Sequence, residues 1–245
     1  MSSLHGDKEI HRSGTGVLTI GKDIGFDTSS VDSYGFETGS KDLRVMLINP
    51  PVSFDMFYGE WDMSDVKSSS PPIGILSLAA MIRKYGYQVK ILDAHAEGLT
   101  IEQIIQEVDL FQPDVVGLTA MTVMISASAS IAEAIKKHNH EITTIIGGVH
   151  FTAEPVETLN RYPQFDFGVI GEGEVVLTEL LEKIRKVEDL SKIQSLVWKG
   201  DVVNVNQRRS FFKSLDEFPP PAFDLVPNLF NHYRLSVFGT KKFRS

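Results

Sequence analysis

The sequence predicts an α/β fold, a doubly wound parallel sheet of five strands with flanking helices, over about residues 43–190. Short, nearly continuous apolar runs alternate along the chain with longer segments whose apolar residues recur at helical spacing. Helical crossovers of this length join parallel strands and place helices on both faces of the sheet. With 245 residues, of which 42% are hydrophobic, the chain is long enough to bury a sizeable core.

The first strand is expected at Leu43–Asn49, an apolar run closed by two prolines, as is typical of a strand buried on both faces. Apolar residues from Ile75 to Ile82 then recur at helical spacing. This helix should end near Gly86, because glycine readily adopts the left-handed conformation of a C-cap.

Four further pairs of a strand and a helix follow. The strands are expected at about Val89–Asp93, Asp114–Thr119, Thr143–Gly147 and Phe165–Ile170. The helices are expected at about Ile101–Phe111, Ser126–His138, Pro155–Asn160 and Glu174–Val187. Thr100 and Gln103 have the spacing of a capping box. The small residues after the third strand predict either a slot for a ligand or tight packing of helix on sheet, in which case Ser126 would be an N-cap.

Two flanking regions differ from the predicted sheet in composition and in hydrophobic pattern. Residues 1–42 are rich in Ser, Gly, Thr and Asp without a sustained apolar period, which indicates a flexible leader. Residues 191–245 are expected to form a small β-hairpin, with strands Ser195–Trp198 and Val202–Val205, and then a proline-punctuated linker.

Composition excludes several classes of function. Without cysteine, the chain itself holds no disulfide, thiolate zinc site, cysteine nucleophile or iron–sulfur cluster. A formal net charge of -8 argues against nucleic-acid binding, which depends on Lys and Arg side chains that neutralise phosphates. No stretch approaches 18 apolar residues and the N-terminus lacks the apolar core of a signal peptide, so we expect no membrane segment and a cytoplasmic location.

The exits of strands three, four and five carry small residues, and ligands of open parallel sheets bind beyond such exits. These exits together predict a deep, narrow cleft, in which adjacent glycines allow the backbone to approach a ligand closely. The predicted binding residues are Thr119, Ala120, Met121, Thr122, Gly147, Gly148, Val149, His150, Gly171, Glu172 and Gly173. Because Glu172 and Glu174 would repel a pyrophosphate, a nucleotide phosphate site is not expected here.

The connection after the first strand, Pro50–Pro72, is long and carries four aromatic residues among acidic ones. Loops of this length are either functional or disordered. Because the aromatic side chains need an apolar surface to cover, we interpret this loop as a lid or a docking surface rather than as plain disorder.

Several motifs, in this order and spacing, resemble the N-terminal cobalamin-binding domain of cobalamin-dependent radical SAM enzymes. They are Asn49–Pro51, Pro71–Ala80, Gly147–Gly148, Val169–Glu174 and the linker residues Leu215–Pro219. The resemblance covers roughly residues 43–235 and implies a Rossmann-like sheet whose cleft takes the nucleotide tail of cobalamin and presents the corrin to a radical SAM barrel.

In that family the radical SAM barrel requires a CxxxCxxC motif to bind its iron–sulfur cluster, and this chain contains no cysteine. The resemblance therefore implies that the chain is a cofactor-binding module that is not catalytic by itself. The iron–sulfur cluster and S-adenosylmethionine would belong to a barrel outside this chain, supplied in cis or in trans. The parent enzyme would be a methyltransferase or would perform related radical chemistry.

Two alternatives remain open at this point. The domain could be a cofactor-free Rossmann-like scaffold that docks a partner, or an independent small-molecule enzyme that uses the cleft. For the second alternative, no spacing in the sequence pairs a nucleophile with a base.

Residues Asp93–Gly98 spell D-x-H-x-x-G, the pattern by which cobalamin-dependent mutases and methionine synthases supply a histidine to cobalt. In those proteins the pattern follows the first strand, whereas here it follows the second. A shift of one strand moves a ligand by about 4.8 Å, far more than a metal–nitrogen bond tolerates. We therefore expect His95 to lie in a polar loop and not to bind cobalt, and we expect no protein metal ligand.

Overall fold

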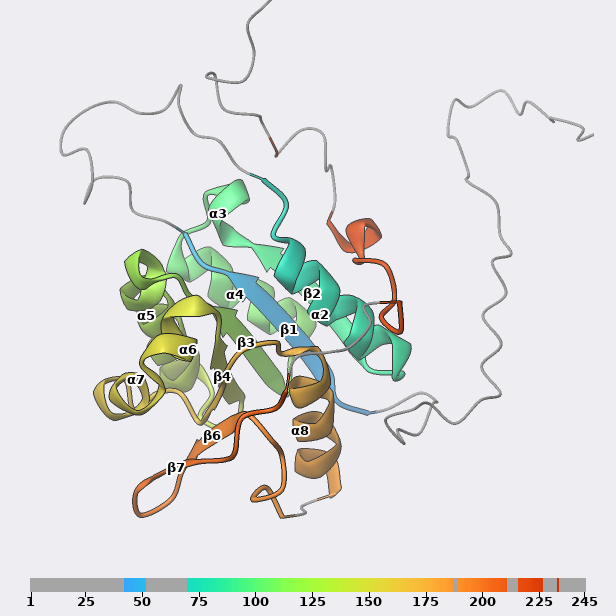
Figure 1. Cartoon of the computed structure of the whole chain (residues 1–245). Helices are drawn as coiled ribbons and strands as arrows, with labels where there is room; N and C mark the ends of the chain where they lie inside the picture. The colour runs from blue at the N-terminus through green and yellow to red at the C-terminus, as the bar shows by residue number, and fades with distance from the viewer. Residues whose placement is uncertain (1–41, 52–69, 187–188, 211–215, 227–232, 234–245) are drawn as a thin grey trace, which may run out of the picture. The chain divides into compact units, whose positions relative to one another are not determined.

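The computed structural model describes residues 42–51, 70–186, 189–210, 216–226 and Tyr233 (Figure 1). Seven strands form one sheet in the order β2-β1-β3-β4-β5-β6-β7. Their bounds are β1 Arg44–Asn49, β2 Gln88–Asp93, β3 Val115–Thr119, β4 Thr143–Gly147, β5 Phe167–Val169, β6 Leu196–Lys199 and β7 Val203–Val205. The first five are parallel, which confirms the predicted doubly wound sheet.

The predicted hairpin also forms, and it extends this sheet. Strand β6 pairs antiparallel with β5 and with β7, so that Val197 lies opposite both Gly168 and Val205. Local sequence predicted the hairpin, but its attachment to the edge of β5 depends on a pairing distant in the sequence.

The helices occupy the connections between the strands. Their bounds are α2 Ile73–Lys84, α3 Ala94–Glu97, α4 Ile101–Phe111, α5 Ile125–His138, α6 Val149–Ala153, α7 Pro155–Arg161 and α8 Glu174–Lys186, with 3₁₀ turns η2 Thr122–Met124 and η3 Phe223–Leu225. No helix in these described segments is long and apolar enough to cross a membrane.

Successive side chains along a strand point to opposite faces of the sheet, so each face has its own part of the core. Met46 and Ile48 point to the face where Ile104 of α4 and Ile135 of α5 are buried. Leu47, between them, faces the opposite side, where α2 and α8 pack against one another. The strands are therefore covered on both faces, as their continuous apolar runs predicted.

Three local predictions differ from the structure. Ser126 is not an N-cap, because η2 runs directly into α5 and places Ser126 inside the helix. His95 lies in α3 and not in a loop, since the Asp93 carboxylate accepts a hydrogen bond from the Ala96 N–H and caps that short helix. Strand β5 is shorter at both ends than predicted. The capping box of Thr100 and Gln103 is confirmed.

Parts of three predicted regions cannot be compared with the structure. The residues outside the described ones are 1–41 of the expected leader, 52–69 of the expected lid, and 211–215, 227–232 and 234–245 of the expected linker.

Candidate functional site

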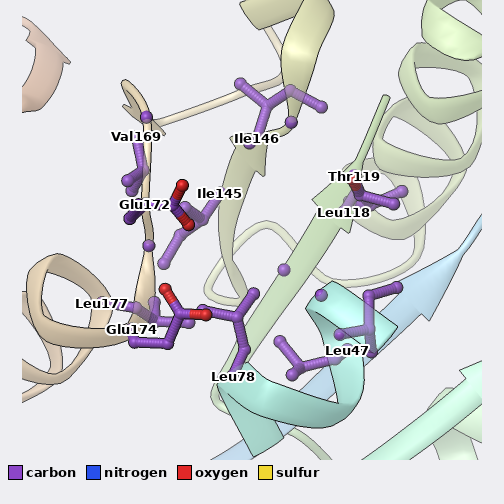
Figure 2. A pocket seen from close by; sticks show the side chains of 17 residues that line it. Leu47, Leu78, Leu118, Thr119, Ile145, Ile146, Val169, Glu172, Glu174 and Leu177 are labelled. Atoms are coloured by element: carbon purple, nitrogen blue, oxygen red, sulfur yellow. The ribbon is translucent and has the colours of Figure 1, made fainter. Parts of the chain in front are cut away.

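A pocket of about 170 Å³ lies at the carboxyl ends of the central strands, between the sheet and helices α2 and α8 (Figure 2). We call it the strand-end pocket. It is lined by Leu47, Gly74, Ile75, Leu78, Gly117, Leu118, Thr119, Ile145, Ile146, Gly147, Gly148, Val169, Gly171, Glu172, Gly173, Glu174 and Leu177. The strand order reverses between β1 and β3, which is where open α/β sheets bind ligands.

Six of the predicted binding residues line this pocket, and they come from three neighbouring strand exits. They are Thr119, Gly147, Gly148, Gly171, Glu172 and Gly173. Strands β3, β4 and β5 are adjacent in the sheet, so the three exits lie side by side.

The other five predicted residues, Ala120, Met121, Thr122, Val149 and His150, do not line the pocket. The Ala120 N–H donates to the Gly147 carbonyl and the His150 N–H donates to the Ala120 carbonyl, at 3.0 and 3.1 Å, so the two loops are bonded to each other. Ala120 is buried in the core, whereas Met121 and Val149 are exposed, at 50% and 69%.

Sequence reasoning missed the residues that enclose the pocket from the sheet and from the helices. The missed residues are Leu47, Gly74, Ile75, Leu78, Gly117, Leu118, Ile145, Ile146, Val169, Glu174 and Leu177. Most resemble ordinary core residues. Gly117 alone carried a signal, because a glycine inside a buried strand often marks close approach of another group.

The glycines of the pocket create space in different ways. A Cβ atom at Gly117 would lie 2.8 Å from Cδ2 of Leu47, so this glycine lets the leucine side chain cross the sheet surface. A Cβ atom at Gly147 would meet no atom within 4 Å. The absent side chain at Gly147 therefore leaves room in the pocket itself.

Gly148 is required by the backbone conformation, whereas Gly147 leaves space in the pocket. Its φ of +95° lies in the region that favours glycine, and a Cβ atom would lie 2.7 Å from Thr119 Oγ1 and 2.8 Å from the Ala120 carbonyl oxygen. Gly148 thus allows the chain to leave β4 tightly against the exit of β3.

The charged groups of the pocket are both carboxylates. Glu172 and Glu174 lie at one end of it (Figure 2), and no Lys, Arg or His is among the lining residues. Burial raises the pKa of Glu174; its backbone N–H opposes this, and the charge of Glu172 raises the pKa further. This end of the pocket therefore suits a neutral hydrogen-bond donor and disfavours a phosphate.

The raised pKa of Glu174 predicts a pH-dependent stability. The folded state holds this proton more tightly than the unfolded chain, so the contribution of Glu174 to stability falls as pH rises from the ordinary carboxyl pKa through the raised one. We expect Glu174→Gln to gain stability relative to the parent across this window, in urea unfolding measured at several pH values. In a Glu172→Gln background the gain should shrink; a difference that is constant with pH would contradict the prediction.

The D-x-H-x-x-G pattern lies beside the pocket and not in it. Strand β2, which ends at Asp93, is at the edge of the sheet, and neither Asp93 nor His95 is a lining residue. Asp93 is buried and accepts hydrogen bonds from the Asn49 side chain and from the hydroxyl of Tyr233. That His95 does not bind cobalt stays a prediction.

No group of three or more His, Asp or Glu side chains among the described residues is arranged to hold a metal ion.

Comparison with known proteins shows which family this chain resembles. Residues 62–181 match the family of the B12 binding domain. The chain is 33% identical over 189 residues to an uncharacterized methyltransferase of Pyrococcus horikoshii, covering 76% of this chain and 39% of that protein. It is 30% identical over 143 residues to the anaerobic magnesium-protoporphyrin IX monomethyl ester cyclase of Rubrivivax gelatinosus, covering 58% and 24% respectively.

Among solved structures, the fold matches the cobalamin-dependent S-adenosylmethionine radical enzyme OxsB with aqua-cobalamin and S-adenosylmethionine bound. The TM-score is 0.61 at 23% identity, over 75% of this chain and 24% of OxsB. The expected resemblance to a cobalamin-binding domain is confirmed by the family match, and the Rossmann-like fold by the structural one. The chain spans 39% or less of the length of these proteins.

Proposed function

We propose that this chain, whose residues 62–181 match the B12 binding domain family, binds cobalamin as the cofactor-binding part of a radical SAM enzyme. The observation that carries the proposal is the strand-end pocket, which lies at the switch point of the sheet and, apart from Leu47, is lined by residues of the matched segment. We further propose that residues 43–190 are the core of the module and that residues 191–245 lead toward its partner.

The residues of the pocket fit the nucleotide tail of cobalamin. The open space at Gly147 and the apolar side chains of Leu78 and Ile145 suit a flat aromatic base. Thr119 and the two carboxylates can hydrogen-bond to hydroxyl groups, while the phosphate would remain outside the acidic end. Bound cobalamin would supply a cobalt centre for group transfer; this chain's own residues would hold the tail and exclude water from it.

The remaining chemistry would come from elsewhere. The sequence contains no cysteine, so the iron–sulfur cluster and S-adenosylmethionine of a radical SAM enzyme would be held by residues outside it, in cis or in trans. We propose methyl transfer or related radical chemistry, since the relatives include a protein named as a methyltransferase and one named as a cyclase. We propose a cytoplasmic location on the sequence pattern alone.

The test uses the purified chain and hydroxocobalamin, with absorbance measured after desalting. We expect the protein to retain the colour of the corrin in a 1:1 ratio. Dicyanocobinamide, which lacks the nucleotide tail, should bind at least about 100-fold more weakly, a difference of about 2.7 kcal/mol.

Each contrary outcome is informative. If the protein retains no corrin, the proposed function is wrong and the cofactor-free docking scaffold is favoured. If cobinamide binds as tightly as hydroxocobalamin, the tail does not occupy the strand-end pocket.

A further inference from the structure

The chain after the hairpin returns to helix α2 and lies along it. We call residues 216–226 the strap; its turn η3 is seen beside α2 in Figure 1. The Ala222 N–H donates to the Leu76 carbonyl at 3.1 Å, and the Arg83 guanidinium donates to both carboxylate oxygens of Asp224. These contacts reach from the first turn of α2 to its last.

Burial shows which side of the strap faces the helix. Ala222 is 1% exposed, whereas its neighbour Phe223 is 40% exposed. Val226, at the end of the strap, is buried as well. The strap is therefore packed against the domain and is not held by the exposed ion pair alone, since exposed ion pairs contribute little to stability.

A second attachment lies further along the chain, at the ends of β1 and β2. The Tyr233 hydroxyl donates to Asp93 Oδ2 at 2.7 Å, while Asp93 Oδ1 accepts from the Asn49 side chain at 2.8 Å. Burial raises the pKa of Tyr233, and the hydrogen bond to Asp93 adds to this, so Tyr233 stays a protonated donor. The hydrogen bonds of Asp93 therefore have a structural role that does not depend on cobalt binding by His95.

Helix α2 also borders the strand-end pocket. Gly74, Ile75 and Leu78 line it, and a Cβ atom at Gly173 would lie 3.1 Å from Leu78 Cδ2. The helix has no side-chain hydrogen bond at its N-cap and carries a glycine in its first turn, both of which weaken a helix start. Its position must therefore come from what packs on it.

We propose that the strap is a positioning element: by holding α2 through Ala222 and Asp224, it fixes one side of the strand-end pocket and thereby sets ligand affinity. The inference rests on the proposed function for the identity of the ligand. It assigns Ala222, Asp224 and Arg83 an effect on binding although none of them lines the pocket.

The main test compares Ala222→Arg, which cannot be accommodated at a buried position, with Phe223→Arg at the adjacent exposed one. We expect Ala222→Arg to accelerate amide exchange in residues 76–84 at least about tenfold and to raise the Kd for hydroxocobalamin by a similar factor. Phe223→Arg should change neither. Exchange in α5 serves as an internal control for global unfolding.

A charge exchange tests the ion pair separately. Arg83→Glu should accelerate exchange in the strap, and Arg83→Glu combined with Asp224→Arg should restore it. If Ala222→Arg changes neither exchange in α2 nor affinity, or changes exchange without affinity, the proposed positioning is overturned. If the parent does not bind hydroxocobalamin, the proposed function is wrong. The positioning is then tested by amide exchange alone, and unchanged exchange in α2 of the Ala222→Arg variant would overturn it.

Discussion

Gly147→Leu should abolish cobalamin binding while leaving the fold intact. The position has no neighbour within 4 Å of an added Cβ, so the backbone tolerates a side chain there. The isobutyl group would project into a pocket of only about 170 Å³ and occupy the volume that the ligand needs. We expect affinity for hydroxocobalamin to fall at least about 100-fold, measured by equilibrium dialysis.

The matched control is Ser130→Leu, the same final residue on the exposed surface of α5. It should bind hydroxocobalamin as the parent does. Thermal unfolding of both variants should stay within a few degrees of the parent, because neither side chain enters the core. A Gly147→Leu variant that folds and binds like the parent would show that the ligand lies elsewhere.

Gly148→Leu would give a different and less useful result. Its positive φ and the contact of a Cβ atom with Thr119 and Ala120 mean that the β4 exit itself must move. Loss of binding in that variant would not distinguish a blocked pocket from a disturbed loop. The two adjacent glycines thus look alike in sequence but have different physical roles.

Much of the fold could be predicted because its signals are local. Continuous apolar strands, helical spacing and the capping box at Thr100 and Gln103 depend on residues close together in the chain. The short helices α3 and α6 were missed because four or five residues cannot show a period. The strap was also hidden, since Arg83 and Asp224 are 141 residues apart.

The site could be predicted only where it coincides with strand exits. Thr119 and Gly147 follow from topology, because neighbouring parallel strands end at one edge of the sheet. Leu78 and Leu177 could not be distinguished from core residues, since their exposure to a pocket depends on how α2 and α8 pack. The charges of Glu172 and Glu174 could be placed at the exit of β5 from the sequence, but the position of the Glu174 side chain in the pocket depends on how α8 packs.

Gly168→Ala should strongly destabilise the protein. Gly168 lies in β5, and a Cβ atom there would be 1.9 Å from Cζ of Phe151, whose ring is fully buried. Overpacking a core costs about 1–3 kcal/mol and occasionally more. Because no rotation of a methyl group relieves this overlap, we expect a loss of about 3 kcal/mol or more in the free energy of unfolding, measured in urea.

A second substitution tests the cause. Phe151→Leu removes the ring atoms that overlap, so the double variant should be more stable than the sum of the two single effects predicts, by at least about 1 kcal/mol. Gly74→Ala is the control, because an added Cβ there meets nothing and alanine favours a helix by up to about 1 kcal/mol. If the losses in the free energy of unfolding were additive in the double variant, the Phe151 ring would not be in contact with Gly168. Since Phe151 belongs to α6, which begins directly after Gly148, this one contact also fixes the loop at the exit of β4.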